Sequence, residues 1–197
     1  VKEPAAAGSD GYRLVVSPAA IEIAAPQPAG LFYGTQTLRQ LLPPEIFASA
    51  PVARAWTVPQ VAIEDAPRFG WRGLLLDVAR HYYPPETIRR YIDLAALHKL
   101  NVLQLHLTDD QGRRMEIRKY PQLTRVGAWR RETRVGHEFR REGFDGTPHG
   151  GFYTQSELRA LVAYAAQRFV TIVPEIEMPG HAQAAIAAYP ELGASGE

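Results

Sequence analysis

Three short apolar runs constrain the fold of this chain more than any other feature of its 197 residues. The runs are Leu74–Val78, Val102–Leu107 and Val170–Val173. Nearly continuous apolar runs of this length are typical of strands that are buried on both faces of a parallel sheet. Apolar residues at helical spacing lie between the runs: Ile88, Tyr91, Ile92 and Ala95, then Leu158, Leu161, Val162 and Ala165. The alternation predicts an α/β fold with a parallel sheet.

Both intervening helices carry signals for their first residues. Pro84 and Pro85 can open the first helix, because proline is tolerated in the first turn. Thr154 and Glu157 form a Thr-x-x-Glu pattern, which predicts a capping box at the start of the second helix. A long loop rich in Arg and Gly is predicted from about residue 111 to residue 153.

Polar side chains follow each predicted strand. They are Arg80 and His81, then Asp109 and Asp110, then Glu175, Glu177 and His181. In (β/α)8 barrels and in open doubly wound sheets alike, the chemistry lies at the C-terminal ends of the strands. The pattern does not separate these two folds. No G-x-G-x-x-G or G-x-x-x-x-G-K-[ST] segment follows the first strand, which argues against dinucleotide and P-loop proteins.

The first 66 residues have a different pattern of apolar residues and are predicted to form a small α+β domain. Residues 12–16 and 21–24 alternate as strands, and Val58–Ile63 supply another short strand. Between them, a helix should bury one face and end before Pro43-Pro44; the residues of that face are Leu31, Leu38, Leu41 and Leu42. Residues 67–70 look like a linker. We therefore predict an auxiliary domain over 1–66 and the α/β domain over 67–197.

The composition excludes several classes of protein. A formal net charge of +1 gives no case for nucleic-acid binding, and the absence of cysteine excludes disulfides and thiolate metal sites. No stretch approaches the roughly 20 apolar residues that a membrane helix needs, and no signal peptide is visible. The chain begins with Val1, so we expect its natural N-terminus to lie further upstream.

Several segments carry a resemblance to a known family. The stretches at 72–84, 99–112 and 173–181 together resemble glycoside hydrolase family 20, the β-N-acetylhexosaminidases. Shorter stretches at 151–154 and 187–192 fit the same family, and residues 30–41 resemble the small domain that precedes its barrel. The resemblance covers nearly the whole chain from about residue 11.

The resemblance implies a fold and a reaction. The fold is an α+β domain followed by a (β/α)8 barrel, of which about three strands would be present here. The reaction removes terminal β-linked N-acetylglucosamine or N-acetylgalactosamine with retention, and the substrate's own acetamide is the nucleophile. The family's catalytic Asp-Glu pair follows the fourth barrel strand, and no Asp-Glu dipeptide occurs among the 197 residues. We therefore expect a fragment that is inactive by itself.

Arg80 is the first residue to which the resemblance gives a role. It implies that the guanidinium of Arg80 grips hydroxyls of the terminal sugar, for which its planar fork of donors is suited. The alternative is an ion pair at the rim of the barrel, with Asp77 or Asp109.

Asp109 and His181 receive supporting roles. The resemblance places Asp109 beside His181, which in turn contacts the catalytic Glu; Asp would fix the tautomer and orientation of the imidazole. We call this pair the Asp109–His181 relay. Asp110 is predicted to be structural. The residue types alone leave open a metal site formed by His106, Asp109 and His181, although these lack a compact ligand motif.

Two positions depart from the family pattern. Glu177 stands where the family usually has Asp, which would move the carboxylate by about 1.5 Å, so Glu177 is predicted only to line the substrate site. Arg113 stands where the family generally has Trp, which bears on substrate preference more than on reaction type. The basic stretch from Arg125 to Arg141 is typical of a solvated surface, and its alternative role is to favour anionic glycans.

The predicted function is hydrolysis of terminal non-reducing N-acetylhexosamines on chitin or peptidoglycan fragments or glycoconjugates, without a cofactor. One rival function is a glycan-binding pseudoenzyme, which the presence of the Asp-Glu pair elsewhere in the protein would exclude. The other rival is a metal-dependent hydrolase that uses His106, Asp109 and His181. Family habit, rather than any visible signal, suggests a bacterial protein in the periplasm or outside the cell.

Overall fold

The computed structural model describes residues 10–136 and 142–194, which form two compact units. The first unit comprises the described residues up to Arg72 together with Asp93–Asn101. The second comprises Gly73–Ile92 and the described residues from Val102 onward. The alternating strands and helices confirm the predicted α/β class. Among the described residues, no helix is both long and apolar enough to cross a membrane.

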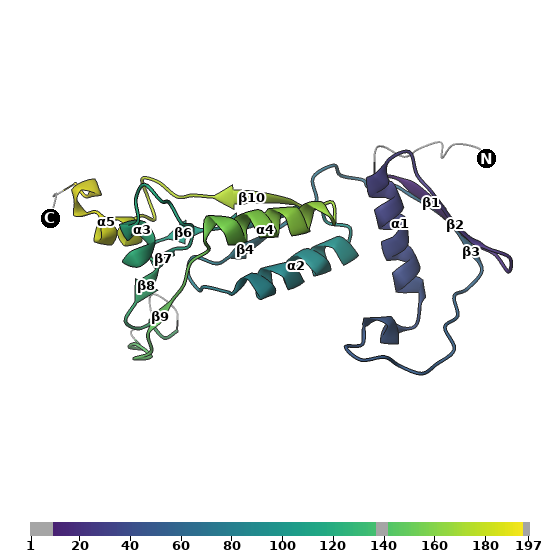
Figure 1. Cartoon of the computed structure of the whole chain (residues 1–197), viewed down its shortest axis with the longest axis horizontal. Coiled ribbons are helices and arrows are strands. Elements are labelled where there is room, and N and C mark those ends of the chain that lie inside the picture. Colours follow the sequence, from purple (N-terminus) through teal and green to yellow (C-terminus); the bar gives the residue numbers. More distant parts are fainter. Residues whose placement is uncertain (1–9, 137–141, 195–197) are drawn as a thin grey trace. The chain divides into compact units, whose positions relative to one another are not determined.

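An antiparallel sheet and one helix form the folded centre of the first unit (Figure 1). The sheet has the order β2-β1-β3, formed by Ile21–Ala24, Tyr12–Val16 and Val61–Asp65. Helix α1 (Pro28–Leu41) contacts β1 and β2, and a 3-10 turn, η1 (Pro44–Phe47), follows it. The strands at 12–16 and 21–24 are confirmed, whereas β3 begins three residues later than the predicted Val58. The reason is that Val61 to Asp65 pair with the full length of β1.

The leucine face predicted for α1 is wrong in part, because Leu31 is exposed. The buried residues of the helix are Gly30, Tyr33, Gly34 and Gln36. The two glycines permit close approach: a Cβ atom on Gly30 would lie 2.2 Å from the carbonyl oxygen of Gly11, and one on Gly34 would lie 2.5 Å from Ile23. Backbone proximity, rather than leucine side chains, therefore sets the face that α1 turns to the sheet.

The second unit contains the predicted parallel sheet, with the order β10-β5-β4. Its strands are Gly73–Asp77 (β4), Val102–His106 (β5) and Thr171–Glu175 (β10), within one or two residues of the predicted runs. Helices α2 (Pro85–Leu97) and α4 (Gln155–Ala166) connect the strands (Figure 1). The capping box of α4 is confirmed: Thr154 Oγ1 accepts from Glu157 N, and the Glu157 carboxylate accepts from Thr154 N.

The two faces of this sheet have different surroundings. Leu76, Leu103 and Leu105 are buried on the face that carries the helices, at 8%, 0% and 0% exposure. On the other face, the register aligns Leu75, Gln104 and Val173 in one row, and Leu75 is 53% exposed. A sequence-based prediction that Leu74, Leu76 and Leu105 line the interior of an incomplete barrel is wrong: these residues share the helix-covered face, and alternation along the strand puts Leu75 on the open face.

Short elements occupy the stretch predicted as one long loop. They are β6 (Thr108–Asp109), β7 (Gly112–Arg113), α3 (Gln122–Arg125), β8 (Trp129–Arg130) and β9 (His149–Gly150), followed after β10 by α5 (Gln183–Ala188) and a 3-10 turn, η2 (Pro190–Leu192). Residues 137–141 of the basic stretch lie outside the described residues. These elements gather beyond the carboxyl ends of the parallel strands (Figure 1).

Candidate active site

Three titratable side chains share one row at the carboxyl end of the parallel sheet. The register pairs Asp77 of β4 with His106 of β5, and His106 with Glu175 of β10. All three therefore project from the same face, one pleat beyond the row of Leu75, Gln104 and Val173. This placement brings two carboxylates to either side of one imidazole.

His106 is buried, at 6% exposure, and both of its ring nitrogens meet carboxylates. Nε2 lies 2.9 Å from Asp109 Oδ2, and Nδ1 lies 2.9 Å from Glu175 Oε1. Burial alone would lower the pKa of His106. The hydrogen bonds to Asp109 and Glu175, with the nearby charges of Glu175 and Asp77, outweigh burial and raise this pKa above its usual value.

Asp109 is the centre of the site, and its side chain is 1% exposed. Its Oδ2 atom accepts from His106 and lies 2.7 Å from Nη2 of Arg80. Its Oδ1 atom accepts from the backbone N–H of Asp110 at 2.6 Å and lies 3.3 Å from Nδ1 of His181. Burial would raise the pKa of Asp109, but these hydrogen bonds and charges lower it overall, so the carboxylate is ionised at neutral pH.

Arg80 joins two carboxylates at the end of β4. Nη1 lies 2.6 Å from Asp77 Oδ2, and Nη2 lies 2.7 Å from Asp109 Oδ2, so both ion pairs that the sequence offered as the alternative are formed. The hydrogen bond to Asp77 raises the pKa of Arg80. Its side chain is still 49% exposed. Since guanidinium has five N–H donors, these two ion pairs leave donors for a ligand, and binding of sugar hydroxyls stays a prediction.

His181 and Asp110 flank the other oxygen of Asp109. The structure brings Asp109 and His181 together, at 3.3 Å, as the resemblance implied. His181 is 53% exposed, and its Nδ1 contact with Asp109 leaves Nε2 for another group. Asp110 Oδ1 accepts from the backbone N–H of Gln183, the first residue of α5, which is a contact of the structural kind.

Glu177 lies with Glu175 and His106 rather than with the Asp109–His181 relay. Its carboxylate is among donor atoms that lie within 4.8 Å of one another in that group. Its backbone N–H donates to Thr108 Oγ1 at 2.8 Å. Burial would raise the pKa of Glu175, but hydrogen bonds from Gln104 and His106, together with Glu177, lower it overall. The predicted site-lining role of Glu177 is not tested by this arrangement.

Arg114 supports the site and was not identified from the sequence. It is fully buried, and its guanidinium donates to four backbone carbonyl oxygens, those of Val78, Ala79, Ala128 and Gly151, at 2.5–3.1 Å. Burial, with repulsion from Arg130, lowers the pKa of Arg114 to about 10. The side chain thus fixes the backbone just before Arg80. Its neighbour Arg113 is also buried, at 7% exposure, and burial lowers its pKa.

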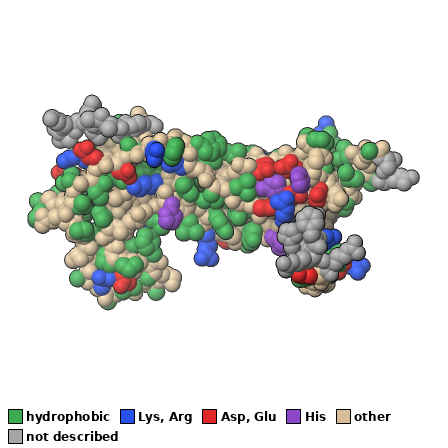
Figure 2. All heavy atoms as spheres, turned by 180° about the vertical axis from the view of Figure 1, so that it is seen from behind, with side chains coloured by type: hydrophobic (Ala, Val, Ile, Leu, Met, Phe, Trp, Pro, Cys, Tyr) green, Lys and Arg blue, Asp and Glu red, His purple; other side chains and the backbone are tan. Residues whose placement is uncertain are grey.

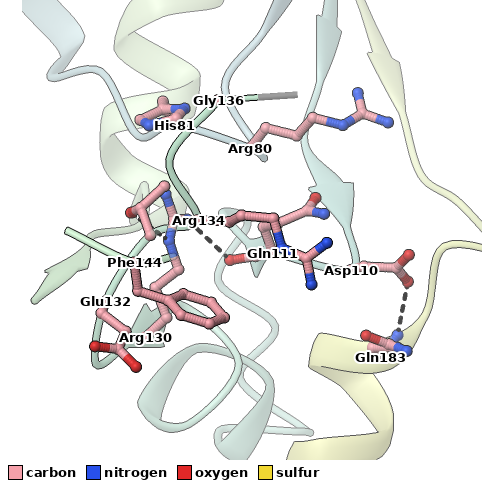
Figure 3. A pocket seen from close by; sticks show the side chains of 11 residues that line it. Arg80, His81, Asp110, Gln111, Arg130, Glu132, Arg134, Gly136, Phe144 and Gln183 are labelled. Carbon is pink, nitrogen blue, oxygen red and sulfur yellow. Dashed lines mark hydrogen bonds between the residues drawn. The ribbon is translucent and has the colours of Figure 1, made fainter. Parts of the chain in front are cut away.

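A cavity of about 660 Å³ opens beside Arg80. Arg130, Arg134, Gln111 and Phe144 are among its lining residues, with Gln111 and Arg134 near its middle (Figure 3). Arg130 donates to Thr133 Oγ1 and to the carbonyl oxygen of Gln111. Acidic, histidine and basic side chains also gather on one face at this end of the second unit (Figure 2). The cavity can therefore receive a polar group next to Arg80.

Two groups of described residues come close enough to share a metal ion. They are His106 with Glu175 and Glu177, and Asp109 with Asp110 and His181. The trio considered from the sequence, His106, Asp109 and His181, is divided between the two groups. Both nitrogens of His106 already meet carboxylate oxygens. The arrangement is therefore that of a hydrogen-bonded network centred on His106 and Asp109.

Comparisons with known proteins show to which family the chain is similar. The family described as glycosyl hydrolase family 20, catalytic domain, matches residues 69–197, and domain 2 of the same family matches residues 1–66. A β-hexosaminidase of Porphyromonas gingivalis is 49% identical over 93% of this chain and 22% of its own length. The N,N'-diacetylchitobiase of Vibrio harveyi is 35% identical over 91% of this chain and 20% of its own length.

Solved structures show the same similarity. A variant of Streptomyces plicatus β-hexosaminidase in complex with its product, GlcNAc, has a TM-score of 0.85 and 44% identity, covering 96% of this chain and 36% of that one. The chain thus spans between a fifth and about a third of the length of these relatives.

Proposed function

The chain belongs to glycoside hydrolase family 20, and we propose that the protein hydrolyses terminal, non-reducing, β-linked N-acetylhexosamine residues of glycans. The observation that carries this proposal is the Asp109–His181 contact beside Arg80, at the carboxyl ends of parallel strands. Relatives named β-hexosaminidase and N,N'-diacetylchitobiase, and a neighbour that holds GlcNAc, support it. Oligosaccharides from chitin or peptidoglycan and glycoconjugates are the proposed substrates.

We further propose that β4, β5 and β10 are the first three strands of a (β/α)8 barrel, within a catalytic domain that begins at residue 67 after an auxiliary domain over 1–66. Helices on one face and an open row of Leu75, Gln104 and Val173 on the other support this, because barrel strands carry helices outside and side-chain layers inside. The row of Asp77, His106 and Glu175 would then close the top of the barrel interior.

In the proposed reaction, the acetamide oxygen of the substrate attacks the anomeric carbon. The glycosidic bond breaks, its electron pair stays on the leaving oxygen, and a carboxylic acid protonates that oxygen. Water then attacks the anomeric carbon of the cyclic oxazolinium, gives its proton to the same carboxylate, and regenerates the acetamide. Configuration is retained through two inversions. The acid and the carboxylate that orients the acetamide correspond to an Asp-Glu pair that these 197 residues do not contain.

The residues of this chain would bind the sugar and hold the acid. Arg80 is exposed enough to donate to sugar hydroxyls while its ion pairs fix its direction. The Asp109–His181 relay would orient the imidazole so that Nε2 meets the catalytic acid, which must stay protonated near neutral pH. Glu177 would line the substrate site.

The test is to express the complete open reading frame and assay chromogenic N-acetyl-β-glucosaminide and N-acetyl-β-galactosaminide. We expect hydrolysis with release of the β-anomer first, and full activity after dialysis against a chelator. Binding of N-acetylglucosamine without hydrolysis, in a protein that lacks the Asp-Glu pair, would instead identify a glycan-binding pseudoenzyme. Activity that the chelator abolishes and a divalent cation restores would refute the proposal in favour of a metal-dependent hydrolase.

A further inference from the structure

His106 occupies an unusual electrostatic position, because it is buried between two carboxylates and near a third. Its Nε2 and Nδ1 atoms each lie 2.9 Å from a carboxylate oxygen, of Asp109 and of Glu175. Asp77 adds a third negative charge from the neighbouring strand. Glu177 lies in the same group of side chains. Arg80 is the nearby cation, and it contacts Asp109 and Asp77 rather than His106.

The number of protons on the ring follows from these contacts. A neutral imidazole has one N–H group, so it could donate to Asp109 or to Glu175 but would turn a lone pair toward the other carboxylate. Two ionised carboxylates at 2.9 Å are both satisfied only by an imidazolium, which donates from both nitrogens. Gln104 donates to the second oxygen of Glu175 at 2.7 Å, which favours the ionised form of that carboxylate.

We propose that His106 is a positioning residue: a buried imidazolium that holds the Asp109 carboxylate ionised and directed at His181. The kinetic part of this inference rests on the function proposed above. The protonation state does not, because it follows from the contacts of His106 alone.

The geometry separates a permanent partner of Asp109 from an exchangeable one. Oδ2 of Asp109 contacts both His106 and Arg80. Oδ1 contacts the backbone N–H of Asp110 and the Nδ1 atom of His181. Arg80 is 49% exposed and is the proposed ligand of the sugar, so a bound substrate can accept hydrogen bonds from it. His106 is 6% exposed, and both of its ring nitrogens are engaged by carboxylates. His106 therefore keeps Oδ2 occupied when Arg80 engages the sugar, and Oδ1 stays with His181.

The first experiment reads the protonation state directly. Nitrogen-15 NMR of histidine-labelled complete protein should show one histidine with both ring nitrogens protonated at pH 7.5, a signal that is absent from His106→Gln. In Glu175→Gln, which keeps an oxygen acceptor but removes a charge, this histidine should titrate at lower pH. A neutral His106 tautomer at pH 7.5 overturns the proposal, whether or not the protein hydrolyses hexosaminides.

The second experiment tests positioning through kinetics. His106→Gln should lower kcat/KM about 10- to 100-fold, the scale of one hydrogen bond to a charged group, mostly through kcat, and should shift the pH profile of kcat/KM. His98→Gln, at an exposed position just beyond α2, is the matched control and should change neither. An unchanged pH profile in a folded His106→Gln overturns the positioning role. If that variant does not fold, Glu175→Gln decides: its own pH profile should shift, and an unshifted profile overturns the role.

Discussion

Each unit of the molecule contains a cluster of charged side chains, and the two clusters differ in charge balance. In the first unit, Lys99 Nζ donates to Tyr12 Oη at 2.7 Å and to Asp65 Oδ2 at 2.8 Å, and Tyr12 also donates to Asp65. One cation thus meets one anion directly, and the Tyr12 hydroxyl contacts both. We call this the Lys99 cluster.

The cluster around Asp109 in the second unit has more acids than permanent cations. Asp77, Asp109 and Glu175 surround Arg80 and His106, so protonation of His106 reduces the excess of carboxylates over cations among these residues but does not remove it. Its outer members, Arg80 and His181, are about half exposed. A balanced cluster fixes two strands and a helix end, whereas an unbalanced one at strand ends presents groups that can meet a ligand.

The largest expected effect is a complete absence of hydrolysis by residues 1–197, although they contain the residues around Asp109. A polypeptide of residues 1–197 should hydrolyse no N-acetylhexosaminide, because the acid and the acetamide-orienting carboxylate have no counterpart among the proposed site residues. The check is turnover of a chromogenic N-acetyl-β-glucosaminide between pH 4 and 8, against a mock preparation. Turnover well above the mock would mean that Asp110, Glu175 or Glu177 acts as the acid.

The Asp109–His181 relay should behave as one unit in the complete enzyme. Asp109→Ala and His181→Ala should each lower kcat/KM by roughly 10²- to 10⁴-fold, the scale of the acid–base catalysis that they support. The double variant should lose little more than the worse single one. As a control, Asp109→Ala combined with Tyr12→Phe of the Lys99 cluster should be additive, because the two residues share no partner. Additive losses within the relay would contradict a shared network.

Arg80→Lys should have the next largest effect. A lysine ammonium replaces the fork with a point charge, so it cannot bridge Asp77, Asp109 and sugar hydroxyls together. The expected loss in kcat/KM corresponds to about 2–4 kcal/mol of transition-state stabilisation. Arg90→Lys, at an exposed position of α2, is the control. Wild-type kinetics in Arg80→Lys would mean that Arg80 forms its ion pairs but does not bind the sugar.

The sequence predicted what depends on local pattern. The strands of the parallel sheet and the capping box at Thr154 follow from apolar runs and from a four-residue signature. The proximity of Asp109 and His181 came from the family resemblance, because they are separated along the chain and meet only through the fold. The prediction of the buried face of α1 was wrong in part, because Gly30 and Gly34 have no side chain and so permit close packing against the sheet.

His106, which the sequence offered only as a possible metal ligand, and Arg114 show why the remainder of the site was not predicted. His106 closes β5, but only the register reveals that Asp77 and Glu175 share its row. The same strand-end rule that singled out Arg80 could have pointed to it. Arg114 lies in a stretch rich in arginine, which is typical of solvated surface, and no local signal shows that four carbonyl groups surround it.

A change of pH should distinguish the two clusters. The pKa of His106 is raised in the folded protein, so its stabilisation is complete below about pH 6.5 and is lost as the pH rises through the raised value. The loss is limited to one proton, about 1.4 kcal/mol per pH unit. The pKa of Lys99 is also raised and that of Asp65 is lowered, so the Lys99 cluster keeps its charges over the same interval.

Amide hydrogen exchange between pH 6.5 and 9, corrected for intrinsic rates, measures this difference. Protection should fall in β4, β5 and β10 while it holds in β1 and β3, and His106→Gln should remove the difference. Equal loss in both sheets would contradict the assignment of the pH-sensitive charge to His106. Below about pH 4 both sheets should lose stability, because the lowered pKa values of Asp109 and Asp65 act in the same direction.

The smallest expected effect tests the Lys99 cluster itself. Tyr12→Phe removes a hydroxyl that bonds both Lys99 and Asp65, yet these two remain 2.8 Å apart and still satisfy each other. The free energy of unfolding should therefore fall by about 1 kcal/mol, the net worth of an ordinary hydrogen bond, rather than by the larger cost of an unpaired charge. Urea denaturation measures it, with Tyr91→Phe at an exposed position of α2 as the control. Since the hydrogen bonds described for Tyr12 are to Thr37, Asp65 and Lys99 of the first unit, kcat/KM should not change. A fall in kcat/KM would show that the Lys99 cluster also contributes to the reaction. That result would contradict the difference in role between the Lys99 cluster and the cluster around Asp109.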